Sequence, residues 1–154
     1  MRTKLSFLFI ACLFAFGCKK ENVDSRPRLT LKDFRTYAVS TNSGNGNIVE
    51  IDLEVSDKEG DIRDSIFIAK IILDPSNCID TLRLKHRIPV FPSGNTDNIL
   101  FQLKFASFGV PGFNGDQVLP GRCSNKDLTT FKICVQDLAG NRSDTISTPP
   151  VIIQ

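Results

Sequence analysis

An acidic loop is the first stretch whose residue types suit a defined chemistry. Asp57, Glu59, Asp61 and Asp64 are interleaved with other residues around Gly60 in the segment DKEGDIRD. Calcium is held by roughly six to eight oxygen ligands, chiefly carboxylates and carbonyls, and such a loop can supply several of them. The spacing differs from the EF-hand pattern, and a solvated turn in which Gly60 takes a positive φ is the favoured alternative. Calcium is the only cofactor that the sequence suggests.

A long loop over residues 106–127 carries the second group of candidate residues. It holds apolar side chains, Phe108 and Phe113 among them, between glycines and prolines. Loops longer than about 12–15 residues are usually functional or disordered. Aromatic rings offer apolar contact area at little entropic cost, so Phe108 and Phe113 are candidate contacts for a glycan or a protein. The favoured alternative is that both rings cap the end of the core.

Catalytic signals are weak. His86 is the only histidine and stands in an alternating strand pattern, which favours a surface or packed role. The sequence contains no GxSxG elbow, no HExxH zinc motif and no phosphate-binding GxxxxGK[ST] loop. Paired carboxylates could hydrolyse glycosides, but acidic residues are common and a sandwich has no evident deep cleft. We therefore expect a protein that is not an enzyme, with a small carboxylate-dependent hydrolase as the weakest alternative.

The N-terminal residues have the order of an export signal. A short basic start, MRTK, precedes an apolar run of about a dozen residues, which is shorter than the roughly 20 of a membrane-spanning helix. Gly17 and Cys18 end the run, and Lys19-Lys20-Glu21 follow. This order resembles the signal of a bacterial lipoprotein, in which the cysteine is acylated and becomes the first mature residue. An ordinary secretory signal that is cut elsewhere is the alternative.

The resemblance divides the chain and implies its location. Residues 1–17 are the signal peptide, 18–28 a lipidated N-terminus with a flexible polar tether, and 29–154 one domain. Acylation of Cys18 would attach the protein to a membrane, since two or more acyl chains hold firmly. An aspartate directly after the acylated cysteine would resemble an inner-membrane retention signal. Lys19 occupies this position instead, which favours the outer membrane. The periplasmic and the surface face of that membrane both remain open.

The charges exclude one class of partner. The chain has 19 lysines and arginines and 17 acidic residues, but Arg2 and Lys4 belong to the signal, so the mature part is neutral. It has no basic stripe with interleaved aromatic residues, and a nucleic-acid partner is therefore disfavoured.

Apolar residues after the tether recur with a period of two, which is typical of strands. The clearest case is the run from Val49 to Val55, where apolar side chains alternate with Glu50, Asp52 and Glu54. The run from Ile66 to Leu73 is nearly all apolar and is expected to be buried on both faces. The strands predicted in this way cover residues 29–39, 49–55, 66–73, 78–86, 99–105, 131–135 and 143–153.

Seven short strands without a helix predict an all-β, antiparallel β-sandwich. The segment 131–146, FKICVQDLAGNRSDTI, resembles the last hairpin of immunoglobulin-like and fibronectin type III-like modules of bacterial surface proteins, and EVSDKEGDI at 54–62 resembles another loop of these modules. The resemblance implies a seven-stranded sandwich in fibronectin type III-like order. Pro149 and Pro150 cannot donate ladder hydrogen bonds, so we expect the last strand at a sheet edge.

This strand order implies which loops meet. Loops 57–64, 87–98 and 138–142 would gather at one end of the sandwich, and loops 41–47, 74–78 and 106–127 at the other.

In an exported chain, Cys78, Cys123 and Cys134 suggest one disulfide and one free thiol. The shared end implies Cys78–Cys123, while Cys78–Cys134 and Cys123–Cys134 remain open.

Together these features predict a lipid-anchored, non-enzymatic envelope module. Its expected partners are a membrane, through the acylated Cys18, and a glycan, a protein ligand or a surface complex with which it assembles. A structural spacer without a ligand of its own is the main alternative, because a fold alone does not define a function.

Overall fold

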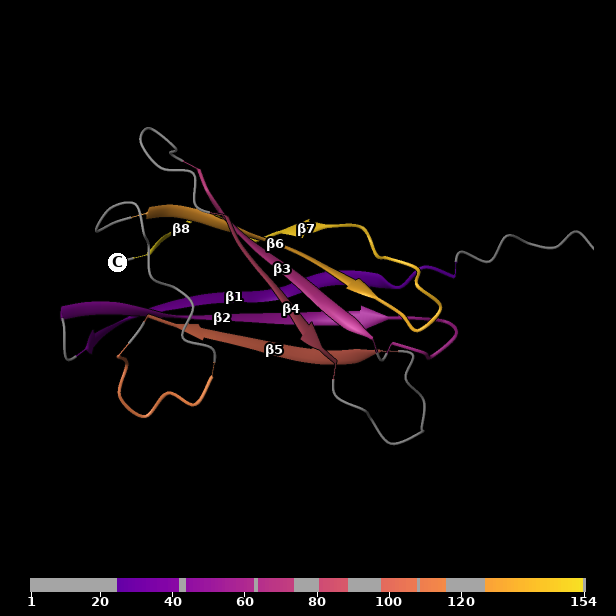
Figure 1. The fold of residues 1–154 in the computed structure, drawn as a ribbon, viewed down its shortest axis with the longest axis horizontal. Coiled ribbons are helices and arrows are strands. Elements are labelled where there is room, and N and C mark those ends of the chain that lie inside the picture. Colours follow the sequence, from indigo (N-terminus) through magenta and orange to yellow (C-terminus); the bar gives the residue numbers. More distant parts are fainter. Residues whose placement is uncertain are drawn as a thin grey trace, which may run out of the picture.

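The computed structural model describes residues 25–41, 44–62, 64–73, 81–88, 98–107, 109–115 and 127–153 of the 154. These residues form two antiparallel β-sheets and contain no helix, which confirms the predicted all-β sandwich (Figure 1). The three-stranded sheet has the order β1-β2-β5, formed by β1 (Arg28–Thr41), β2 (Gly44–Ser56) and β5 (Ile99–Ala106). The five-stranded sheet has the order β4-β3-β6-β7, with β8 also paired to β6; its members are β4 (Thr81–Arg87), β3 (Ser65–Ile72), β6 (Asp127–Gln136), β7 (Ile146–Ser147) and β8 (Val151–Ile153).

The core lies between the two sheets and is built by the residues that alternate inward. On β2 these are Val49, Ile51, Leu53 and Val55, all 0% exposed, as the sequence predicts. Apolar side chains of β3 and β6 complete the core from the other sheet. The rings of Phe105 and Phe131 stack across the interface with centroids 5.8 Å apart. Burial of this apolar surface is the main stabilising contribution to the fold.

Strand β3 differs from its prediction. Ile66 and Ile68 are buried in the core, but Phe67, Ala69 and Ile71 on the opposite face are only partly buried. The expectation that this strand is buried on both faces is therefore wrong. The five-stranded sheet has one face on the core and one on solvent, as antiparallel sheets commonly do.

The C-terminal segment forms two short strands where the sequence predicts one, so the described residues contain eight strands. Pro149 and Pro150 lie between β7 and β8, where a missing N–H interrupts the ladder. Thr148 continues the attachment to β6: its Oγ1 accepts from the Phe131 N–H at 3.0 Å, and its N–H donates to the Phe131 carbonyl at 2.9 Å. Among the described strands, β7 and β8 pair only with β6, consistent with the predicted edge position.

The two ends of the sandwich gather different loops. At the proximal end, where β1 begins, the Leu138 N–H donates to the Asp61 carbonyl at 3.2 Å, so loops 57–64 and 138–142 meet as predicted (right in Figure 1). At the distal end, the Ser107 N–H donates to the Asn47 carbonyl at 2.9 Å. Strand β2 begins at Gly44 and pairs with β1 from there, so the described part of the predicted loop over 41–47 is strand.

Candidate functional site

Asp57, which is buried, and Asp61, which is partly buried, form a carboxylate pair at the proximal end. Asp57 directly follows β2, is 4% exposed, and its Oδ2 accepts a hydrogen bond from the Asp61 N–H at 3.1 Å. Gly60, with φ of 67°, allows the chain to turn between them. The Oδ1 atoms of both Asp57 and Asp61 are buried and accept no hydrogen bond. Two carboxyl groups in this arrangement favour a proton on one of them.

Asp137 adds a third carboxylate from the neighbouring loop. It is 1% exposed, and its carboxylate accepts hydrogen bonds from the Asn141 N–H at 2.7 Å and from the Asn141 Nδ2 at 2.9 Å. Gly140, with φ of 89°, completes this turn. The Asp-Leu-Ala-Gly-Asn motif is thus explained by the closure of a tight turn.

These surroundings keep one proton bound at mildly acidic pH. Burial raises the pKa of Asp61 from 3.8 to about 6, assisted by a side-chain hydrogen bond with Asp57. The negative charges of Asp137, Asp57 and Glu59 raise the pKa further.

The predicted calcium residues do not form a ligand set. Glu59 is exposed, while Asp57 and Asp61 face each other. Within the described ranges, no three or more His, Cys, Asp or Glu side chains are placed so that they could hold a metal ion. Calcium at Asp57, Glu59, Asp61 and Asp64 stays a prediction from the sequence, without a geometry that supports it.

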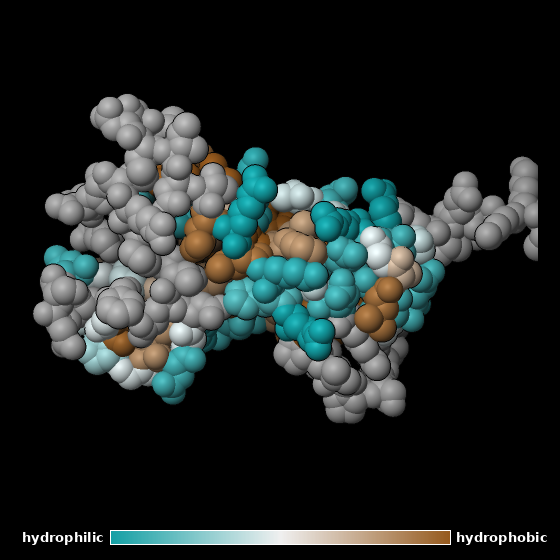
Figure 2. Space-filling view, in the orientation of Figure 1, coloured by the Kyte–Doolittle hydropathy of each residue, from teal (hydrophilic) through white to brown (hydrophobic). Residues whose placement is uncertain are grey.

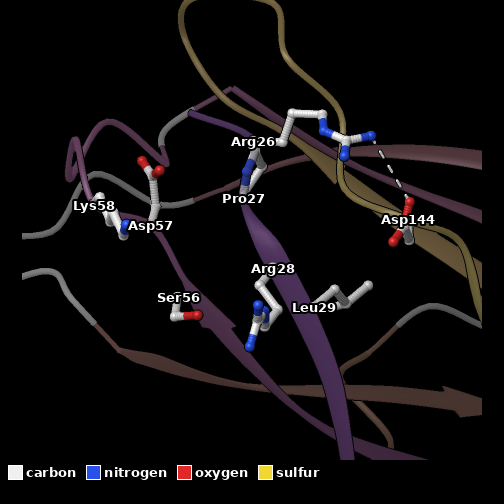
Figure 3. A pocket seen from close by; sticks show the side chains of 8 residues that line it. All are labelled: Arg26, Pro27, Arg28, Leu29, Ser56, Asp57, Lys58 and Asp144. Atoms are coloured by element: carbon white, nitrogen blue, oxygen red, sulfur yellow. Dashed lines mark ion pairs between the residues drawn. The ribbon is translucent and has the colours of Figure 1, made fainter. Parts of the chain in front are cut away.

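A pocket of about 570 Å³ lies beside this pair, where the tether meets the sandwich (Figure 3). Its lining mixes both charge signs and consists of Arg26, Pro27, Arg28, Leu29, Ser56, Asp57, Lys58 and Asp144. Figure 3 shows Arg26 extended toward Asp144, with 4.0 Å between Nη1 and Oδ1. Both side chains are more than half exposed, so this ion pair contributes little to stability. The pocket was missed because the sequence assigns Arg26 and Pro27 to a free tether.

A second groove, of about 460 Å³, opens between the edge strands β4 and β5. Ile66, Ile88, Phe101 and Leu103 are among its apolar lining residues, and His86 also borders it. The groove exists because β4 and β5 belong to different sheets and do not pair with each other.

Of the two predicted aromatic contacts, Phe108 lies outside the described residues. Phe113 is partly buried and packs against the backbone of its own loop: a Cβ on Gly115 would come within 2.6 Å of the Phe113 ring. Phe113 is not among the side chains that pack against the core, so neither the capping nor the contact interpretation is decided.

Of the three cysteines in residues 29–154, the structure describes one. Cys78 and Cys123 lie outside the described residues, so their disulfide stays a prediction. Cys134 is a free thiol on β6, so neither alternative pairing through Cys134 is present.

The outer face of the three-stranded sheet carries paired charges. Arg35 Nη2 lies 2.6 Å from Asp52 Oδ2 and 3.5 Å from Glu50 Oε2. Lys104 Nζ lies 2.7 Å from Glu50 Oε1. Lys32 pairs with Glu54 at 2.8 Å. Each acid of the alternating β2 pattern therefore has a cationic neighbour on β1 or β5.

The outer face of the five-stranded sheet is different and carries cations without acidic partners. Its charged residues, which we call the basic face, are Arg83, Lys85 and Arg87 of β4, Lys132 of β6 and Arg142 of the following loop. None of the five forms a salt bridge with an aspartate or glutamate of the described chain. The basic face was missed because the balanced net charge was taken to exclude such a patch; the i, i+2 spacing of Arg83, Lys85 and Arg87 was the available signal.

Residues 1–24, with Cys18, lie outside the described residues. In the part of the chain that the structure does describe, no helix is long and apolar enough to cross a membrane. No protein-family model matches the chain, and no curated protein matches it in sequence.

Proposed function

We propose that this protein is a lipid-anchored, non-enzymatic module of the bacterial cell envelope that binds a glycan or protein ligand or assembles with a surface complex. The observation that carries the proposal is the place where the chain that follows Cys18 enters the sandwich. Pro27 is buried and Leu29 belongs to the core, so the tether joins the sandwich at the proximal end. The distal end and both outer faces then remain available to partners.

The proposed anchor also limits the position of the domain. Arg28 is the tenth residue after Cys18, and an extended chain advances at most ~3.6 Å per residue, which corresponds to about 36 Å. An acylated Cys18 would therefore keep the sandwich close to the membrane, and we propose the outer membrane as its location.

We further propose a fibronectin type III-like arrangement of the sandwich. The order β1-β2-β5 in one sheet and β4-β3-β6-β7 in the other supports this, because it corresponds to strands A-B-E and C′-C-F-G of those modules. In this assignment β7 and β8 together make up the last strand.

The anchor is tested by the substitution Cys18→Ser. In the native type of cell, the unchanged protein is expected in the membrane fraction and the variant in the soluble fraction, since the acyl chains have lost their attachment site. Cys134→Ser is the matched control and should stay with the membrane. Retention of the Cys18→Ser protein in the membrane fraction would refute the anchor.

A further inference from the structure

We propose that the basic face binds a linear, carboxylated polysaccharide. This inference deepens the proposed function by naming its ligand class, and it rests on the proposed role as a binding module but not on the lipid anchor.

The cations stand on both sides of one strand. Arg83 pairs in register with Ala69 of β3, which pairs in turn with Lys132 of β6, so these two cations face each other across β3. Neighbouring strands are about 4.8 Å apart, which places Arg83 and Lys132 on backbones roughly 10 Å from each other. Along β4, alternate residues are separated by about 6.5–7 Å, so Arg83, Lys85 and Arg87 form a charged wall along the strand direction. Lys132 alone forms the opposite wall on β6.

The floor between these walls is apolar. It consists of Phe67, Ala69 and Ile71, which are partly buried. Ala69 and Ile71 have shorter side chains than the cations beside them, while Lys85 and Arg142 lie over the Phe67 ring. A polysaccharide offers apolar ring faces to such a floor and carboxylates to the walls. In the view of Figure 2, hydrophilic surface follows the course of β4 with hydrophobic surface beside it.

Two of the cations are held in place before a ligand arrives. Lys85 Nζ lies 5.3 Å from the centroid of the Phe67 ring, and the Arg142 guanidinium lies 4.6 Å from the same centroid. The Arg142 Nε also donates to Gln136 Oε1 at 3.0 Å, which orients the guanidinium plane. Its terminal N–H groups then suit bidentate contact with a carboxylate. Side chains ordered in advance lose less entropy on binding.

The excess of positive charge on this face favours a polyanion. Residues 18–154 have equal numbers of acidic and basic residues, yet these five cations form no salt bridge with an acidic residue of the described ranges. Clustered charge of one sign attracts an oppositely charged ligand over a distance set by ionic strength. A flat anionic membrane would meet the cationic side chains but not the lower floor, so a linear polymer fits the surface better.

Binding is tested with polygalacturonate as the probe and residues 18–154 carrying Cys18→Ser as the protein. Isothermal titration at low salt is expected to detect binding that weakens as salt is raised. The same polymer with its carboxylates esterified should not bind. The double variant Arg83→Gln/Lys132→Gln should weaken binding by about tenfold or more, the equivalent of losing two modest ionic contacts.

A matched double variant on the opposite face provides the control. Lys32→Gln/Lys104→Gln removes the same number of positive charges from the outer face of the three-stranded sheet, and it should leave the affinity unchanged. Bound polymer should also slow the alkylation of Cys134, read by peptide mass spectrometry, because Cys134 lies beside Phe67 in register.

Three outcomes would overturn the inference. One is the absence of binding to polygalacturonate, which would favour the spacer alternative. Another is equal weakening by the two double variants, which would indicate attraction by net charge alone. The third is binding to phosphatidylglycerol vesicles but not to the polymer, which would identify a membrane contact. None of these results bears on the Cys18 fractionation test, so the anchor and the ligand can fail separately.

Discussion

The outer faces of the two sheets are built from the same alternating pattern but differ in how their charged residues are paired. On the three-stranded sheet, Glu50 and Asp52 of the central strand are surrounded by Arg35 and Lys104 from its neighbours. On the five-stranded sheet, the central strand β3 presents Phe67 and Ala69, and cations flank it on both sides. The comparison teaches that a net charge of zero conceals a strongly polarised surface. One face is neutralised internally, while the cations of the other face form no salt bridge with an acidic residue of the described ranges.

The largest expected effect comes from core substitutions, which test whether the two sheets unfold together in one cooperative transition. Ile51→Ala beneath the paired face and Ile133→Ala beneath the basic face each remove a side chain that is 0% exposed. Each substitution should lower the free energy of unfolding by about 2–5 kcal/mol, through lost burial and a residual cavity. Urea unfolding followed by circular dichroism checks the values. Two separate transitions, one for each sheet, would show that the faces are stabilised independently.

An intermediate effect is expected from the carboxylate pair at the proximal end, where the two faces meet. The folded-state pKa of Asp61, about 6, exceeds its ordinary value of 3.8, so the native state binds more protons between these two pH values. The contribution of this proton to stability is complete below about pH 4 and is lost as the pH rises through about 6. Asp61→Asn keeps a donor for Asp57 at every pH and should melt at a higher temperature than the unchanged protein at pH 7.

The pH comparison has an internal control in the same loop. Glu59 is exposed and its charge is the smallest of the causes that raise the pKa of Asp61, so Glu59→Gln should change the melting temperature at pH 7 by less than Asp61→Asn does. If Asp61→Asn melts at the same temperature as the unchanged protein from pH 4 to pH 7, the pair shares no proton.

The smallest expected effect compares single cations on the two faces. Lys104→Ala leaves Glu50 with one fewer partner and should cost less than about 1 kcal/mol, as is usual for surface ion pairs. Lys85→Ala removes like-charge repulsion but also the contact of Lys85 with the Phe67 ring, so the free energy of unfolding should change by less than about 0.5 kcal/mol in either direction. Salt should reduce the first effect because it screens the ion pair. A larger loss for Lys85→Ala than for Lys104→Ala would contradict the contrast between the faces.

The sequence alone determined the features that depend on local periodicity. The inward residues of β2 from Val49 to Val55 and the position of Pro149 and Pro150 at a sheet edge could be predicted, because side chains alternate along any extended strand. The Cys18 anchor is likewise a prediction of local sequence.

The tertiary structure decided what lies next to what. Arg83, Ala69 and Lys132 become neighbours only when β4 and β6 pair with β3, and Asp61 meets Asp137 only because two distant loops share one end. It also decided that the outer side of β3 faces solvent, which its nearly all-apolar sequence concealed. Alternation follows from the geometry of a single strand, whereas the neighbours across strands depend on which distant segments pair. The basic face and the buried carboxylates belong to that second kind of information.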